Sequence, residues 1–124
     1  MSDRYQDIID VLKRYYDGLY HCDAAMLETV FHPRAQYATT SSGALLHYDM
    51  PAYMAVIRER TPPADLGDKY GYAITSIRFA GDDTAHAVLQ CTMMGKHFTD
   101  FLSFIRTGDE WRIIAKIFHY DLAT

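Results

Sequence analysis

The sequence predicts one small α+β domain in which N-terminal helices pack on a curved sheet around a single pocket. Its 124 residues match the size of one domain. Apolar residues recur at helical spacing in the first part of the chain, whereas the last part reads as long strands separated by short glycine turns. Helices followed by strands, without strand–helix–strand alternation, are typical of an α+β arrangement and not of a parallel sheet.

Two helices are predicted at the N-terminus. Asp3, with Gln6 three residues later, is a variant of the capping box, and apolar residues then recur at helical spacing as far as Leu19. Asp23 is the expected N-cap of a shorter second helix, and Pro33 blocks its continuation. The two helices are expected to form one hairpin.

A short β-hairpin and a third helix are expected next. Residues 35–40 and 44–48 read as strands on either side of a Ser-Ser-Gly turn. Asp49 and Pro51 indicate the start of a helix, because proline is tolerated in a helical first turn. The loop of residues 61–69 follows, opens with prolines and is expected to be mobile.

The remainder is predicted to be four long strands. Glycine-containing connections of hairpin length separate them, so that they form an antiparallel meander. The predicted strands are Tyr72–Ala80, Thr84–Met94, His97–Arg106 and Trp111–Leu122.

Composition and charge argue against several classes of function. A net charge of −4 with scattered basic residues disfavours nucleic-acid binding. No apolar run approaches the ~20 residues that a membrane span requires, so a cytoplasmic protein is expected. The two cysteines, Cys22 and Cys91, read as small hydrophobic residues in a reducing compartment. Dispersed histidines and the absence of a glycine-rich phosphate loop predict no metal and no cofactor.

Several short segments, in their order along the chain, resemble the NTF2-like (nuclear transport factor 2-like) superfamily, in particular its SnoaL-like and "Putative lumazine-binding" groups. These segments span nearly the whole chain: Tyr15–Leu19, Asp23, Phe31–Ala35, Phe98–Ser103, Gly108–Ile114 and Lys116–His119. The resemblance implies a cone-shaped, cystatin-like fold with three helices on a curved mixed or antiparallel sheet. It also implies a pocket between sheet and helices and, commonly, a homodimer through the outer sheet face.

Asp100 and Lys116 are the most informative polar residues, because each interrupts an otherwise apolar strand. A three-residue loop between the two strands would put both side chains on one face, whereas a two-residue loop would put them on opposite faces. Three interpretations remain open: an ion pair on the outer or dimer-facing surface, a pocket pair that binds a ligand or transfers a proton, or two solvent-exposed side chains.

His119 is the third candidate catalytic residue. It alternates with Trp111, Ile113, Ala115 and Ile117, which form the more continuously apolar side of the last strand and the expected interior face. Polar residues near the end of this strand often face the pocket in NTF2-like proteins. His119 is therefore either an acid–base group or a histidine of the core or dimer interface.

Four further residues are candidate ligand contacts. Tyr16 and Tyr20 lie one helical turn apart, so their phenols could share the cavity mouth or stack on the sheet. His32 precedes a proline, where a histidine often bonds a backbone group. Tyr48 forms a possible polar wall with His47, and one of those two must face outward in a strand.

The resemblance leaves two classes of function, since the superfamily contains both enzymes and noncatalytic binders. One is a cofactor-independent isomerase, dehydratase or cyclase that transfers protons on a small aromatic or cyclic molecule. The other is a noncatalytic dimeric module for ligand binding or interaction. The Asp-Tyr-Asp arrangement of ketosteroid isomerases and the paired histidines of scytalone dehydratase have no secure counterparts in this sequence.

Overall fold

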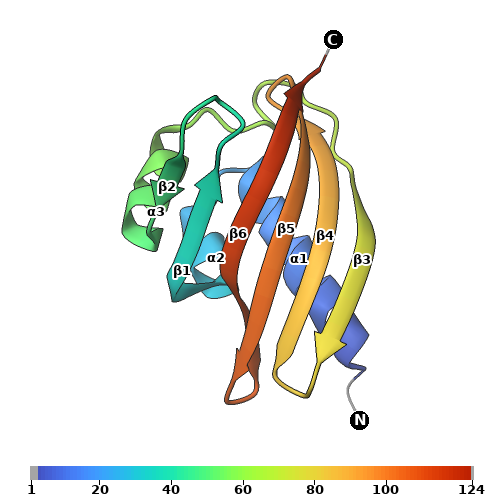
Figure 1. The fold of residues 1–124 in the computed structure, drawn as a ribbon. Coiled ribbons are helices and arrows are strands. Elements are labelled where there is room, and N and C mark those ends of the chain that lie inside the picture. The colour runs from blue at the N-terminus through green and yellow to red at the C-terminus, as the bar shows by residue number, and fades with distance from the viewer. Residues whose placement is uncertain (1–2, 124) are drawn as a thin grey trace.

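The computed structural model describes residues 3–123, which form three helices and one curved six-stranded sheet (Figure 1). The first helix crosses behind the long strands, and the second and third helices lie beside the first strand (Figure 1). The elements in chain order are α1 (Arg4–Tyr20), α2 (Ala24–Val30), β1 (Phe31–Thr39), β2 (Leu46–Tyr48), α3 (Met50–Glu59), β3 (Tyr72–Ala80), β4 (Thr84–Met93), β5 (Lys96–Thr107) and β6 (Glu110–Leu122).

Each helix begins at an aspartate that accepts a backbone N–H of the first turn. The predicted N-caps Asp3, Asp23 and Asp49 are confirmed. The reciprocal half of the first capping box does not form, because the Gln6 amide donates to the Asp10 carboxylate at 2.9 Å instead. The aspartate side chain that accepts a hydrogen bond at the start of each helix could thus be predicted from the local sequence.

The hairpin of α1 and α2 depends on a glycine in the α1 interior. A β-carbon at Gly18 would lie 2.7 Å from Cγ of the fully buried Leu27. Glycine costs about 1 kcal/mol of helix propensity, so its place here reflects the close approach of α2.

The sheet has the order β2-β1-β6-β5-β4-β3 and is mixed. The predicted meander of β3 to β6 and the β1–β2 hairpin are confirmed, with the long strands beginning and ending within one residue of expectation. The β4–β5 turn consists of Met94 and Gly95, both at positive φ as in a type I′ turn. Among the strands of the described residues, only β1 and β6 pair in parallel.

A β-bulge in β6 changes which residues face the interior. Ser103 pairs with Ala115, but the next residue, Phe104, pairs with Ile113, so Ile114 is an extra residue in β6. An extra residue reverses the alternation of side chains between the two faces.

The expectation that one odd-numbered face of β6 is interior is therefore wrong beyond the bulge. Trp111 and Ile113 are buried, as predicted. Past Ile114 the inward positions become even-numbered, so Ile117 is 49% exposed and the His119 side chain is 63% exposed.

The loop of residues 61–69 is fastened to the rest of the fold at both ends. The N–H of Ala64 donates to the Tyr20 carbonyl at 3.0 Å, and the Asp68 carboxylate accepts the N–H of Met94 at 2.8 Å. The Tyr20 hydroxyl also donates to the Asp68 carbonyl. Its expected mobility stays a prediction.

Both cysteines are free thiols, with Cys91 buried and Cys22 partly buried. Within residues 3–123, no helix is long and apolar enough to cross a membrane.

Candidate functional site

A cavity of about 160 Å³ lies between the inner face of the sheet and the helices. Its inner part is lined by buried residues of four strands and two helices, including Tyr37, Tyr53 and Phe118. Arg60 and Lys96 contribute partly exposed side chains nearer the surface. Two of the sequence candidates, Asp100 and Lys116, line this cavity, as do three of the four rings that surround Lys116, those of Tyr37, Tyr53 and Phe118.

Asp100, on β5, is the polar centre of the cavity. Its side chain is 1% exposed, and its Oδ2 accepts the hydroxyl of Tyr15 at 2.6 Å. Its Oδ1 is buried and has no hydrogen-bond partner among the described residues. A buried acceptor without a partner is costly, which marks this atom as a place where a donor would bind.

Tyr15 reaches Asp100 from α1, where helical spacing turns its ring toward the sheet. Burial, and secondly the Asp100 charge, hold the pKa of the Tyr15 phenol well above its ordinary value. Tyr15 therefore remains a hydrogen-bond donor to the carboxylate.

Lys116, on β6, is 5% exposed and is surrounded by aromatic rings. Its Nζ lies 4.9 Å from the ring centroid of Phe118, and the rings of Tyr15, Tyr37 and Tyr53 lie at 5.2, 5.4 and 5.6 Å. Such cation–π contacts stabilise an ammonium without neutralising it. No carboxylate of the described residues lies within the 4.0 Å ion-pair distance of Lys116.

Asp100 and Lys116 share the inner face of the sheet without forming an ion pair. Asp100 pairs across the strands with Phe118, and Leu102 pairs with Lys116, so the two charged residues are diagonal neighbours. The β5–β6 turn has two residues, and without a bulge a turn of this length would place Asp100 and Lys116 on opposite faces of the sheet. The bulge at Ile114 restores the common face.

Two more phenols and a thiol line the cavity. Burial raises the pKa of Tyr37 to about 12, opposed by the Lys116 charge. The hydroxyl of Tyr53 is buried without a partner among residues 3–123, and burial raises its pKa further still. Burial, and then the Asp100 charge, raise the pKa of Cys91 to about 12.

Sequence reasoning did not assign Tyr15, Tyr37 and Tyr53 to the site. The available signal was the unusual number of tyrosines, ten in 124 residues, with Tyr15 and Tyr53 on predicted buried helix faces. That signal does not distinguish a phenol beside a carboxylate from one packed in the core.

Tyr16 and Tyr20 are stacked, with ring centroids 5.9 Å apart, but neither lines the cavity. They pack with Tyr70 in an aromatic cluster. The Tyr16 hydroxyl accepts the N–H of Gly71 at 3.1 Å. Of the two interpretations of this pair, the structure therefore favours stacking over a shared cavity mouth.

His32 and Tyr48 also lie outside the cavity lining. His32 Nδ1 accepts the N–H of Arg34 at 3.0 Å, so this histidine bonds the backbone. The ring of Tyr48 packs on Tyr37 at 5.3 Å, behind the cavity wall, while His47 is exposed.

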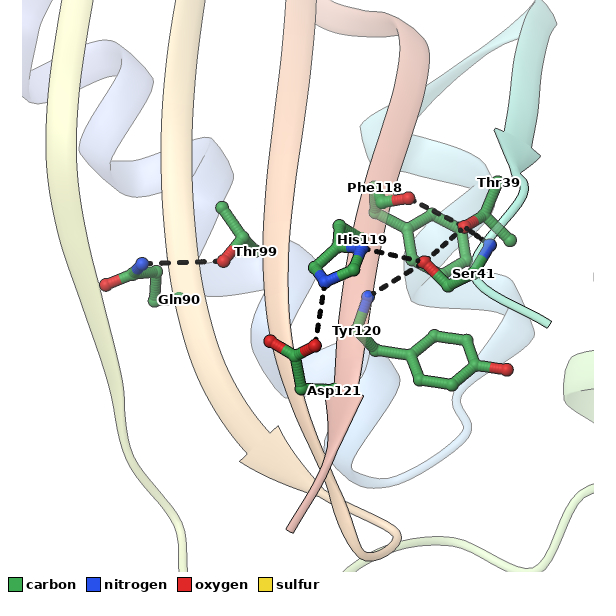
Figure 2. Close-up of polar contacts among 8 residues, drawn as sticks. All are labelled: Thr39, Ser41, Gln90, Thr99, Phe118, His119, Tyr120 and Asp121. Atoms are coloured by element: carbon green, nitrogen blue, oxygen red, sulfur yellow. Dashed lines mark hydrogen bonds and ion pairs between the residues drawn. The ribbon is translucent and has the colours of Figure 1, made fainter. Parts of the chain in front are cut away.

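His119 belongs to a polar network on the exposed face of β6 (Figure 2). Its Nδ1 lies 3.1 Å from Ser41 Oγ, and its Nε2 lies 3.0 Å from Asp121 Oδ1. Ser41 Oγ also accepts the N–H of Tyr120 at 3.1 Å. The serine, histidine and aspartate form a hydrogen-bonded chain, but neither His119 nor Asp121 lines the cavity, and this network does not include Asp100.

Among the described residues, no group of three or more His, Cys, Asp or Glu side chains is placed to hold a metal ion.

Comparison with known proteins identifies the family. The family model described as "Putative lumazine-binding" matches residues 3–119. No curated protein matches the sequence.

Solved structures of low sequence identity share the fold. An NTF2-like protein of unknown function from Methylobacillus flagellatus has a TM-score of 0.85 at 20% identity, covering 98% of this chain and 94% of that one. One from Shewanella baltica has a TM-score of 0.84 at 23% identity, with 97% and 95% coverage. A cystatin-like fold protein from Burkholderia xenovorans has a TM-score of 0.69 at 15% identity, with 96% and 92% coverage. The solved structures show that the chain has the NTF2-like fold, and the family match over nearly its whole length shows that this protein belongs to the "Putative lumazine-binding" family.

Proposed function

We propose that the protein binds a small, ring-containing organic molecule in its cavity, with Asp100 as the polar anchor. The observation that carries this proposal is that the buried Asp100 lines the cavity, with one carboxylate oxygen held by Tyr15 and the other without a partner among the described residues. A ligand hydroxyl or N–H would satisfy that second oxygen.

The size of the cavity supports a compact ligand. A cavity of about 150 Å³ in another protein holds one benzene molecule, and the present one has about 160 Å³. Aromatic walls from Tyr37, Tyr53 and Phe118 suit a flat ring. The family description names lumazine, whose two fused rings are larger, so we propose a ligand with a single ring.

The same residues support catalysis by proton transfer, such as isomerisation, dehydration or cyclisation. Asp100 would accept a proton from the bound molecule through Oδ1, while Tyr15 holds the carboxylate in position. Lys116 would stabilise negative charge that develops on the substrate, because no carboxylate of the described residues lies within ion-pair distance of its ammonium. His119 has no part in this scheme, since it lies on the exposed face.

Noncatalytic binding is the second candidate function. The favouring observation is that Asp100 is held by a 2.6 Å hydrogen bond from Tyr15, which also suits a fixed anchor. Product analysis on a bound compound separates the two candidates.

A thermal-shift screen of cyclic metabolites tests binding, and analysis of the incubated hits tests turnover. Asp100→Asn keeps the size of the side chain but removes its charge, so it is expected to abolish the shift caused by any hit. His119→Asn is the control and is expected to bind as the native protein does. Loss of binding in the His119 variant with retention in the Asp100 variant would overturn the proposal.

We also propose a homodimer through the outer sheet face and a cytoplasmic location. Cross-strand pairing aligns Val88, Phe101, Ile117 and Ala38 in one apolar row, where Phe101 is 51% exposed and Ile117 49%. Phe101→Glu is expected to yield monomers in light-scattering measurements of mass, and an unchanged mass would contradict this interface. Two free thiols suit a reducing compartment.

A further inference from the structure

The charges that line the cavity do not balance. Among the described residues, three cationic side chains, Arg60, Lys96 and Lys116, contribute to the lining, against a single carboxylate, that of Asp100. The lining therefore carries a formal charge of +2, within a chain whose formal net charge is −4. An acidic protein that gathers cations around the cavity that holds Asp100 is arranged to attract a negative ligand.

None of the three cations is neutralised by the described part of the chain. No carboxylate of residues 3–123 lies within 4.0 Å of any of them. The ammonium of Lys96 lies over the Tyr120 ring at 4.7 Å, and that of Lys116 is held by aromatic rings. The nearby Asp68 is occupied by the backbone of Met94 and is not part of the lining.

The positive charge acts inside the cavity and not only at its rim. Burial raises the pKa of Tyr37, and both Lys116 and Arg60 oppose that rise. Arg60 acts in the same direction on the buried Tyr53. The field of these cations therefore reaches the space between the rings.

We infer that the cavity selects a small organic anion: a single-ring molecule with one carboxylate directed toward Lys116 and Arg60 and a hydroxyl or N–H directed toward Asp100 Oδ1. The inference rests on the proposed binding function and names its ligand class. The two ends of the ligand must differ, because Asp100 would repel a carboxylate and the unpaired oxygen requires a donor.

The test is calorimetric titration of the full chain with three compounds of matched shape: 4-hydroxybenzoate, 4-hydroxybenzamide and 4-hydroxybenzylamine. They are anionic, neutral and cationic at neutral pH. Replacing a neutral hydrogen bond by one between a carboxylate and a buried ammonium is expected to favour the anion about tenfold or more. Because Arg60 and Lys96 are partly exposed, this preference is expected to weaken at high salt.

Lys116→Met is expected to remove most of the preference for 4-hydroxybenzoate over its amide. The variant retains an apolar side chain of similar length, so its fold can be verified by circular dichroism before titration. Arg58→Gln is the matched control, because Arg58 pairs with Glu28 outside the cavity and its loss is expected to leave all three affinities unchanged.

The outcomes separate this inference from the proposed function. Equal affinity for the acid and the amide, or preference for the amine, overturns the anion inference and leaves small-molecule binding standing. If none of the three compounds binds, the test is a thermal-shift screen of a wider set of cyclic acids, each compared with its own amide and amine. Hits confined to amides or amines overturn the inference alone, and no hit at all overturns both.

Discussion

The loss of one hydroxyl group is expected to have opposite effects at two buried tyrosines. Tyr15 and Tyr53 are both fully buried, at 0% and 1% exposure. Tyr15 donates to the buried Asp100 carboxylate, whereas the Tyr53 hydroxyl has no partner in the described chain. The two substitutions by phenylalanine therefore remove the same atom from similar surroundings and differ mainly in the hydrogen bond.

Tyr15→Phe is expected to lower the free energy of unfolding by about 1.5–3 kcal/mol, the usual contribution of a hydrogen bond to a charged group. For a domain of this size that corresponds to a melting temperature lower by roughly 5–15 °C. Tyr53→Phe is expected to be neutral or stabilising by up to about 1 kcal/mol, because it removes a buried polar group that no described residue satisfies.

Urea denaturation followed by circular dichroism at neutral pH measures both variants. A double-mutant cycle of Tyr15→Phe with Asp100→Asn is expected to give a coupling energy of at least ~1 kcal/mol. Equal losses at Tyr15 and Tyr53, or a coupling energy near zero, would refute the assigned roles of the two hydroxyls.

Three further predictions concern pH, thiol reactivity and packing. Burial raises the folded-state pKa of Tyr37 from 10.0 to about 12. The free energy of unfolding is therefore retained below pH 10 and is expected to fall between pH 10 and 12, by about 1.4 kcal/mol per pH unit for each such tyrosine. A constant melting temperature over this pH range would contradict the prediction. Cys22 is expected to react with iodoacetamide before Cys91, because Cys91 is buried and its thiol has a pKa of about 12. The reverse order of modification in peptide mass spectrometry would disprove this. Gly18→Ala is expected to destabilise the fold by about 1–2 kcal/mol, because the added methyl group would contact Leu27. If the losses in free energy of unfolding of Gly18→Ala and Leu27→Ala simply add in the double variant, this contact is not the cause.

Features that depend on neighbouring residues were predicted well. The three aspartate N-caps and the hairpin turns involve hydrogen bonds or dihedral angles within a few residues, so Asp3, Asp23 and Asp49 could be recognised without knowledge of the fold. The four long strands followed from the same local signals. The parallel pairing of β1 with β6 did not, because it joins segments about 80 residues apart.

The candidate site was predicted in part. Asp100 and Lys116 stood out because charged residues in apolar strands need a partner or a cavity, and both line the cavity. Tyr16, Tyr20, His32 and Tyr48 were reasonable by residue type, but side-chain direction and competing partners place them elsewhere.

The sequence by itself determined the helix starts, the strand order of the meander and the presence of two charged residues in the apolar strands. Only the tertiary structure decided which way those strands face, because one extra residue at Ile114 reverses the alternation of β6. That reversal places Lys116 with Asp100 on the inner face and His119 on the outer one. The residues around Ile114 do not predict the bulge, because the free energy of forming it depends on how β6 packs against β1, β5 and the helices.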